Sequence, residues 1–158
     1  MNVVTSTRRD FMKLGAGAFS LAIAPGSALA QEEKESAKVV LRCCVMSDVH
    51  FDGKEDSQER KRFIRAIQAV YEYAESQPYD KFDALLVVGD QSNHGIPAQL
   101  ELFKRTMDEN IREGTKTILC MGNHEFYGGN ADIWRNIFGV EPNARYEVNG
   151  YQFIAISP

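Results

Sequence analysis

The sequence predicts an α/β fold that begins with a parallel sheet. Three observations support this: short apolar runs alternate with amphipathic segments of helical length, the first three runs each end in a short polar loop, and an Asn-Gly pair separates two apolar runs near the end. The length of 158 residues suits one domain, and the composition, 44% hydrophobic and 25% charged, is that of a globular protein.

The first part of the predicted domain alternates strand, helix and strand. Residues 39–46 form an apolar, β-branched run that is typical of a buried strand. Apolar side chains recur at helical spacing over residues 55–77, which predicts an amphipathic helix that Pro78 ends. Residues 84–88 predict a second strand, and a polar loop over residues 91–96 follows it.

The same patterns continue downstream. They predict, in chain order, a helix, a strand, a Gly-rich loop and a short helix, at residues 97–112, 117–121, 122–130 and 131–138. Pro97 favours the start of its helix and Gly114 its end. Residues 145–148 and 151–156 flank Asn149-Gly150, which predicts a hairpin with a type I′ turn.

The first thirty residues predict an export signal. Residues 7–13, Thr-Arg-Arg-Asp-Phe-Met-Lys, resemble a twin-arginine motif, a weakly apolar stretch follows over 14–24, and Ala28-Leu29-Ala30 fits a cleavage site. We therefore expect the twin-arginine machinery to export the protein to the bacterial periplasm or beyond. The stretch is too short for a stable membrane anchor. Residues 31–38 form a charged, flexible lead-in, and the domain occupies residues 39–158.

Cysteine content and charge narrow the possibilities further. Cys43, Cys44 and Cys120 lie in apolar runs, so we expect small buried side chains instead of a disulfide framework or a Cys-metal site. The formal net charge is −4, and the first thirty residues are net basic, so the remaining chain is more acidic still. This balance indicates no specific nucleic acid partner, but it permits a phosphate substrate because bound metal ions reverse the local charge.

Three polar loops at three successive strand ends carry the candidate chemistry. They hold Asp48-Val49-His50, Gly89-Asp90 and Gly122-Asn123-His124-Glu125. Alone, Asp-x-His arises often by chance and an Asp in a turn commonly caps the chain. Together, at the carboxyl ends of strands, they predict one site, because ligands bind beyond those ends in open α/β sheets. Carboxylate and imidazole together suit Zn, Fe or Mn better than Ca.

Over residues 39–125 the chain resembles the calcineurin-like metallophosphoesterases, whose motifs are D-x-H, G-D and G-N-H-E or G-N-H-D. The resemblance implies a layered metallophosphoesterase-like fold, a β-sheet sandwich flanked by helices. It also implies two divalent metal ions, of Mn, Fe, Zn or Co. The function it implies is hydrolysis of a small-molecule or polymeric phosphate ester, either a monoester or a diester, by a hydroxide that the two metals activate.

The resemblance also implies a role for each motif residue. Asp48 and His50 bind the first metal, and Asp90 bridges both. Asn123 binds the second metal and contacts the substrate phosphate. His124 lies just outside the metal ligands, where it contacts phosphate, steadies the transition state or protonates the leaving oxygen. Glu125 is expected to orient His124.

The family pattern continues with a further His and a G-H-x-H element, whereas this chain has only three histidines, His50, His94 and His124. We therefore expect the domain to be incomplete at its C-terminus, and the chain alone to bind metal weakly with little or no activity. His94 is a possible substitute ligand, although a surface or supporting position is the better interpretation. Three aromatic residues could line a substrate pocket or belong to the core: Phe126, Tyr127 and Trp134.

Two other functions remain open. The first is a non-catalytic module that binds metal or phosphate on the same scaffold, but the intact set of Asp90, Asn123 and His124 disfavours decay of an enzyme. The second is a nuclease with the same fold, which the acidic charge and the lack of a basic stripe disfavour.

Overall fold

A computed structural model describes residues 38–128 and 131–158, so the predicted export signal lies outside the described residues. In chain order the elements are β1 (Cys43–Met46), α2 (Gln58–Glu75), β2 (Ala84–Val88), α3 (Pro97–Asn110), β3 (Lys116–Cys120), α4 (Asn123–Gly128), α5 (Ala131–Phe138), β4 (Ala144–Val148) and β5 (Tyr151–Ala155). None of the helices within the described ranges is long and apolar enough to cross a membrane.

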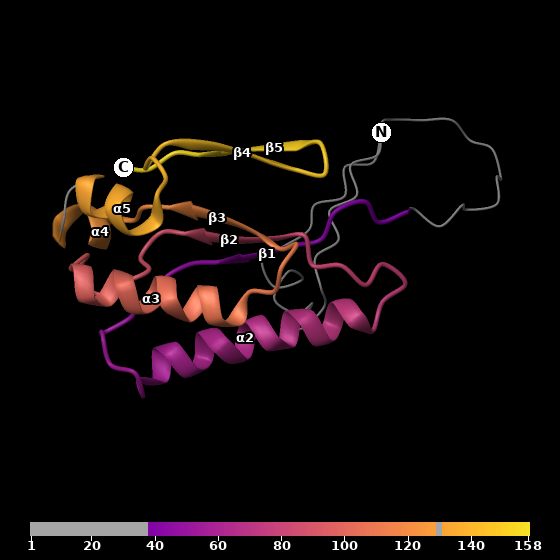
Figure 1. Ribbon diagram of the computed structural model, residues 1–158, viewed down its shortest axis with the longest axis horizontal. Coiled ribbons are helices and arrows are strands. Elements are labelled where there is room, and N and C mark those ends of the chain that lie inside the picture. Colours follow the sequence, from indigo (N-terminus) through magenta and orange to yellow (C-terminus); the bar gives the residue numbers. More distant parts are fainter. Residues whose placement is uncertain (1–37, 129–130) are drawn as a thin grey trace, which may run out of the picture. The chain divides into compact units, whose positions relative to one another are not determined.

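The predicted α/β fold is confirmed. Strands β1, β2 and β3 form a parallel sheet in that order, and β4 and β5 form an antiparallel hairpin. Met46, Val87 and Leu119 are neighbours across the sheet, so the three strands end at the same edge. Figure 1 shows three layers, with α2 and α3 on one side of the sheet and the hairpin on the other.

The helix layer holds the larger core. Ser57 caps α2 by accepting the N–H of Arg60 at 3.2 Å, and the helix buries an apolar stripe spaced by three or four residues: Phe63, Ile67, Tyr71 and Ala74. Phe51, which follows the first loop, is fully buried and packs edge-on against Phe63 and Phe103. Leu85 and Val87 meet this core from the helix-facing side of the sheet.

The hairpin layer covers the other side of the sheet only in part. Tyr146, Val148 and Ala155 pack with Ala84 and Ile118 in a second, smaller core. The turn confirms the predicted type I′ geometry, because Asn149 and Gly150 have φ values of 51° and 80°. No element within the described ranges covers the β1 edge of this face, and Val45 there is 59% exposed.

Three sequence expectations need correction. The first strand begins at Cys43 and not at residue 39, because regular pairing with β2 starts at the Cys43–Ala84 pair. At Arg42 the backbone N–H already bonds the side chain of Asp83 in place of a backbone carbonyl. Residues 122–130 contain helix α4 where a loop was expected. Cys43 is exposed, because it lies on the open side of the β1 edge, while Cys44 and Cys120 are half-buried. Burial nevertheless raises the pKa of all three thiols, which disfavours the metal-binding thiolate.

Candidate metal centre

The first two loops run side by side beyond the ends of β1 and β2. The N–H groups of Asp48 and His50 donate to the carbonyls of Gly89 and Asp90, at 3.2 Å and 3.0 Å. Phe51 continues the pairing by donating to Gln91 at 3.0 Å. The parallel pairing therefore extends past the strands and fixes how the two motif loops face each other.

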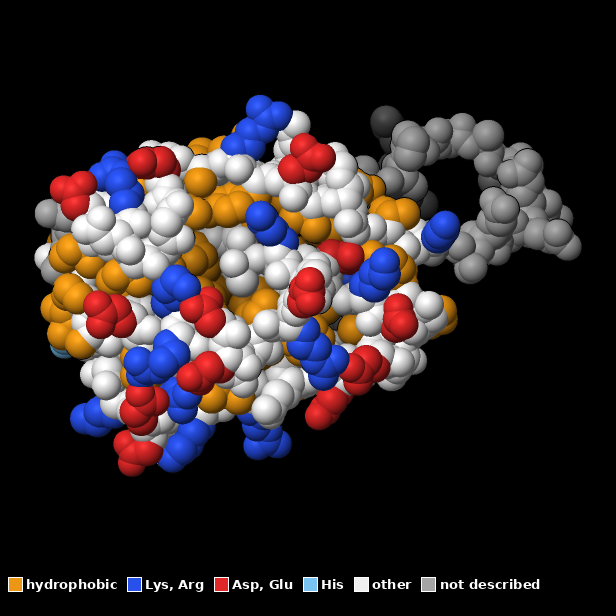
Figure 2. Space-filling view, in the orientation of Figure 1, with side chains coloured by type: hydrophobic (Ala, Val, Ile, Leu, Met, Phe, Trp, Pro, Cys, Tyr) orange, Lys and Arg blue, Asp and Glu red, His pale blue; other side chains and the backbone are white. Residues whose placement is uncertain are grey.

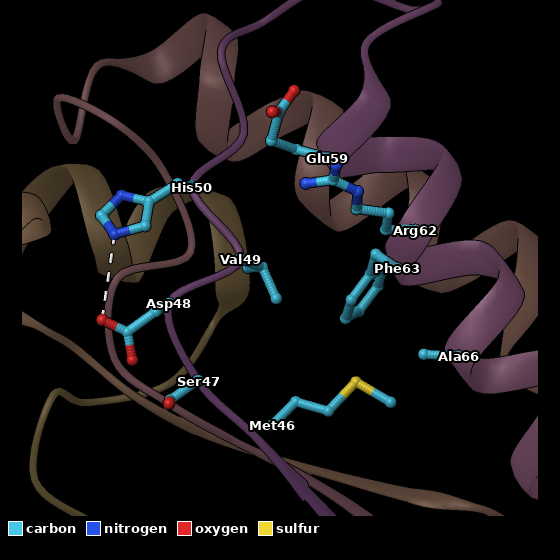
Figure 3. A pocket seen from close by; sticks show the side chains of 9 residues that line it. All are labelled: Met46, Ser47, Asp48, Val49, His50, Glu59, Arg62, Phe63 and Ala66. Atoms are coloured by element: carbon cyan, nitrogen blue, oxygen red, sulfur yellow. Dashed lines mark ion pairs between the residues drawn. The ribbon is translucent and has the colours of Figure 1, made fainter.

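Three motif residues have left-handed backbone conformations, with φ values of 55° at Asp48, 50° at His50 and 53° at Asp90. This conformation costs a residue with a side chain about 1–2 kcal/mol, so the surrounding contacts must hold it. The residue between the first two, Val49, packs against the helix-side core instead. Asp48 and His50 thus leave the chain on one side, and Figure 3 shows Val49 turned away from them toward α2.

Side chains from all three loops converge at this edge of the sheet. His50, Asp90 and His124 each offer one ligand atom, and these atoms lie within 4.8 Å of one another. The rings of His50 and His124 meet edge to face with centroids 4.7 Å apart. Asp48 Oδ1 lies 3.8 Å from His50 Nε2, and a dashed line in Figure 3 marks this pair. Two ligands of one ion lie roughly 3–3.5 Å apart, so small shifts would let His50 share a metal ion with Asp48 or Asp90.

The third motif opens a short helix instead of a loop. Phe126 N–H closes the first turn of α4 by donating to Gly122 O at 3.2 Å. The free N–H groups at this helix start find carboxylates: His124 N–H donates to Asp90 Oδ1 at 3.2 Å, and Gly122 N–H donates to Glu125 Oε2 at 2.9 Å. Asn123 is the first residue of the helix and is exposed. One acceptor within the helix and one distant in sequence, Asp90, therefore favour a helix that composition alone disfavours.

Two glycines bring the second and third loops into backbone contact. A Cβ atom on Gly122 would lie 2.1 Å from Asp90 Oδ1 and 2.3 Å from Asp90 N, so only glycine fits there. A Cβ atom on Gly89, whose φ is 95°, would lie 3.1 Å from the Cα of Gly122. The glycines of the G-D and G-N-H-E motifs therefore seat Asp90 directly against the start of α4.

The His124 ring is held directly by Asn93 and not by Glu125. His124 Nδ1 lies 2.6 Å from the carbonyl oxygen of Asn93. A carbonyl only accepts, so Nδ1 carries the proton and Nε2 is left to act in the site. The expected contact between Glu125 and the His124 ring is not found: Glu125 accepts hydrogen bonds from Asp90, Ser92 and Gly122. The sequence showed Asn93 as part of a polar loop but gave no sign of this contact.

The remaining candidates lie outside the cluster. His94 is exposed and uses its backbone N–H to bond Gln99, in keeping with a surface histidine. Trp134 is 1% exposed and packs against Phe138, so it belongs to the core. Phe126 and Tyr127, in the second half of α4, are 58% and 82% exposed, so their contact with substrate stays a prediction.

A cavity of about 530 Å³ borders the first loop. Asp48 and His50 form one wall, Glu59 and Arg62 of α2 form the opposite wall, and apolar side chains such as Phe63 line it between them (Figure 3). No sequence pattern indicates this cavity, because it lies between a loop and the face of a helix. The face seen in Figure 2 mixes acidic and basic side chains of the described residues without a stripe of one sign.

The donors fit a metal ion. Carboxylate and imidazole groups lie together at the carboxyl ends of parallel strands, and such mixed O and N donors suit Mn, Fe, Zn or Co. The fold and the site thus define an α/β protein of the metal-binding class.

Comparison with known families agrees with this class. The family model of calcineurin-like phosphoesterases matches residues 41–157, and the chain belongs to this family. Members of the family typically bind divalent metal ions and hydrolyse phosphoester bonds, which supports a metal-dependent phosphoester hydrolase in general terms. A comparison with curated proteins found no match.

Proposed function

We propose that this protein hydrolyses phosphate esters with two divalent metal ions held at the carboxyl edge of the parallel sheet. The observation that carries the proposal is the convergence of His50, Asp90 and His124 within 4.8 Å, from three loops far apart in sequence. Membership of the calcineurin-like phosphoesterase family supports the class of reaction.

Each loop contributes a separate part of the proposed site. Asp48 and His50 bind the first ion, and their 3.8 Å separation suits two ligands on one metal. Asp90 contributes to both ions, since a carboxylate has two oxygens and its Oδ1 already faces the start of α4. Asn123, the first residue of that helix, supplies a neutral oxygen to the second ion and contacts the substrate phosphate.

His124 is the proposed proton donor. Asn93 holds its Nδ1–H, so the protonated ring presents Nε2–H to the leaving oxygen and keeps its orientation after the proton has moved. When bound, the two metals supply an activated hydroxide and neutralise charge on the phosphoryl oxygens. The protein residues bind the ions and orient the substrate phosphate, and His124 transfers a proton to the leaving oxygen.

The number of ligands sets the expected affinity. The first position has Asp48, His50 and Asp90, the second has Asp90 and Asn123, and closed sites use four or more. We therefore expect these 158 residues to bind Mn²⁺ or Zn²⁺ weakly. Isothermal titration calorimetry measures this, and two tight sites would contradict the ligand count.

Hydrolysis at saturating metal tests the assignment. Expected turnover of p-nitrophenyl phosphate or bis-p-nitrophenyl phosphate is slow, is abolished by a chelator and falls roughly 100-fold or more in Asp90→Asn and His124→Ala. His94→Ala is the matched control and keeps its activity. Unchanged turnover in both site variants would contradict the assignment.

We also propose that residues 1–30 direct export by the twin-arginine route, supported by the motif around Arg8 and Arg9. Fused to a fluorescent protein that folds in the cytoplasm, these residues should deliver fluorescence to the periplasm. Replacing both arginines by lysine should retain it in the cytoplasm. Equal export of the two fusions would contradict this route.

A further inference from the structure

The fold buries one carboxylate of the third motif almost completely. Glu125 is 1% exposed, and the residues in the described ranges place no Lys, Arg or His in an ion pair with it. Its partners are hydrogen-bond donors instead. Oε2 accepts the N–H of Asp90 at 3.0 Å and of Gly122 at 2.9 Å. Oε1 accepts the N–H and the hydroxyl of Ser92, at 2.9 Å and 2.8 Å.

These four contacts use the bonding capacity of the side chain. An ionised carboxylate has about four acceptor sites, so Glu125 has none left for a metal ion or a substrate proton. This excludes Glu125 as a ligand or a general base in the observed geometry. Glu125 must therefore affect the site through the groups to which it is hydrogen-bonded.

The bonded groups belong to the two loops that carry the other site residues. Oε2 joins the N–H of Asp90 to the N–H of Gly122, the residue before Asn123, and so ties the second loop to the start of α4. Asp90 has a left-handed φ of 53°, and its N–H is held by Glu125 while its Oδ1 is held by His124 N–H. Residues of α4 thus hold both the backbone N–H and the side-chain carboxylate of Asp90 by hydrogen bonds.

The second carboxylate oxygen of Glu125, Oε1, holds the loop that contains Asn93 and orients His124. Ser92 Oγ donates to Glu125 and accepts the N–H of Gly95 at 2.9 Å, which folds this loop against α4. A Cβ atom on Gly95 would lie 2.7 Å from His124 O, so the packing is close. Asn93 lies inside this loop, and its carbonyl holds His124 Nδ1.

We propose that Glu125 is a positioning residue, whose buried carboxylate fixes Asp90, the start of α4 and the Asn93 carbonyl in one geometry and so sets metal affinity and His124 orientation. This inference rests on the proposed function for its metal centre. It assigns to Glu125 a link between loops, in place of direct contact with the His124 ring.

The test compares two buried carboxylates that receive the same change. Glu125→Gln keeps the shape but turns an amide N–H₂ toward two donor groups. Asp83→Asn makes the corresponding change at a 6% exposed carboxylate at the other end of β2. We expect Glu125→Gln to lose roughly 10–100-fold in Mn²⁺ affinity by calorimetry, as substitutions behind metal ligands commonly do. Asp83→Asn should keep the wild-type affinity.

Both variants are measured well below their melting temperatures, with folding checked by circular dichroism. Nitrogen-15 spectra of the His124 ring give a second readout that needs no metal and that mere destabilisation does not move. The wild type should show one fixed tautomer with Nδ1 protonated, and Glu125→Gln a mixture of tautomers. If Glu125→Gln does not fold, Ser92→Ala replaces it and should lose several-fold in affinity with partial loss of the fixed tautomer.

The outcomes separate the two claims. Wild-type affinity together with a fixed His124 tautomer in the folded Glu125→Gln variant would overturn the positioning role and leave the proposed function standing. Lack of metal binding by the unchanged protein would contradict the proposed function, while the His124 spectra would still decide the role of Glu125. An equal loss of affinity in Asp83→Asn would also overturn the inference, because destabilisation alone would then explain the loss.

Discussion

The two ends of β2 each hold a buried carboxylate, and they use it differently. At the amino end, Asp83 accepts the N–H of Arg42 at 2.7 Å, the hydroxyl of Tyr79 at 2.7 Å and the amide of Asn149 at 2.9 Å. It joins the segment before β1, the α2–β2 connection and the hairpin turn. At the carboxyl end, Glu125 joins the loop after β2 to the start of α4.

The difference lies in the backbone and the ligand atoms around each carboxylate. The only left-handed non-glycine residue bonded to Asp83 within the described segments is Asn149, which a type I′ turn requires. The edge near Glu125 has three, and it also gathers the potential metal ligands. Burial of a carboxylate is thus common to a structural joint and a candidate site, whereas backbone strain beside converging ligand atoms marks only the second.

The largest predicted effect comes from a substitution that disrupts the site at the carboxyl end of β2 without replacing a proposed metal ligand. In Gly122→Ala the new Cβ would overlap Asp90 N and Oδ1, at 2.3 Å and 2.1 Å, so Asp90 must move. We expect a loss of more than roughly 100-fold in Mn²⁺ affinity by calorimetry, because one group serves both proposed ions.

Its matched control is Gly139→Ala. Gly139 has a φ of 69° with nothing within 4 Å of a Cβ atom, so this change costs about 1–2 kcal/mol of backbone strain and leaves affinity unchanged. Normal metal binding by folded Gly122→Ala would contradict the close packing of the two loops.

A smaller effect is predicted for the amino end. Asp83→Asn leaves donors facing an amide group and should lower the free energy of unfolding by about 1–3 kcal/mol, as measured by urea denaturation. Metal affinity should not change. A large fall in metal affinity would contradict the proposal that only the carboxyl end of β2 supports the metal centre.

The smallest predicted effect concerns Tyr79 and pH. Burial, and then the hydrogen bond to Asp83, raise the pKa of Tyr79 above its usual value of about 10. The unfolded chain therefore loses this proton first, so the stabilisation is complete below about pH 10 and declines as the pH rises through the folded-state pKa. Denaturation curves should fall more steeply with pH in the wild type than in Tyr79→Phe, which loses about 1 kcal/mol at neutral pH. Parallel curves would contradict this assignment.

Local patterns predicted most of the fold. The strand at Ala84–Val88 and the helix at Ala131–Phe138 match their predicted ranges, since each is an apolar segment with clear polar or glycine neighbours. Helix α4 was missed because glycine-rich composition disfavours a helix. One acceptor at its first turn, Asp90 Oδ1, is 34 residues away along the chain from His124.

For the site too, local patterns predicted some features and missed those that depend on contacts between distant segments. Placement at strand ends was enough to bring Asp48, His50, Asp90 and His124 together, because parallel strands end at one edge. The partners of Glu125 and the Asn93 carbonyl beside His124 could not be predicted, since they depend on how loops pack. The metal-binding and catalytic roles of these residues stay predictions.

The most direct measurement follows the ring nitrogens of the three histidines by nitrogen-15 NMR during a Zn²⁺ titration. His94 is an internal control, since it lies outside the cluster. A coordinated ring nitrogen shifts strongly. We expect a large shift at His50 up to saturation, with His124 Nδ1 still protonated and His94 unchanged. Saturation with zinc that leaves His50 unshifted, or that shifts His94 instead, would contradict a metal centre at the carboxyl edge of the sheet.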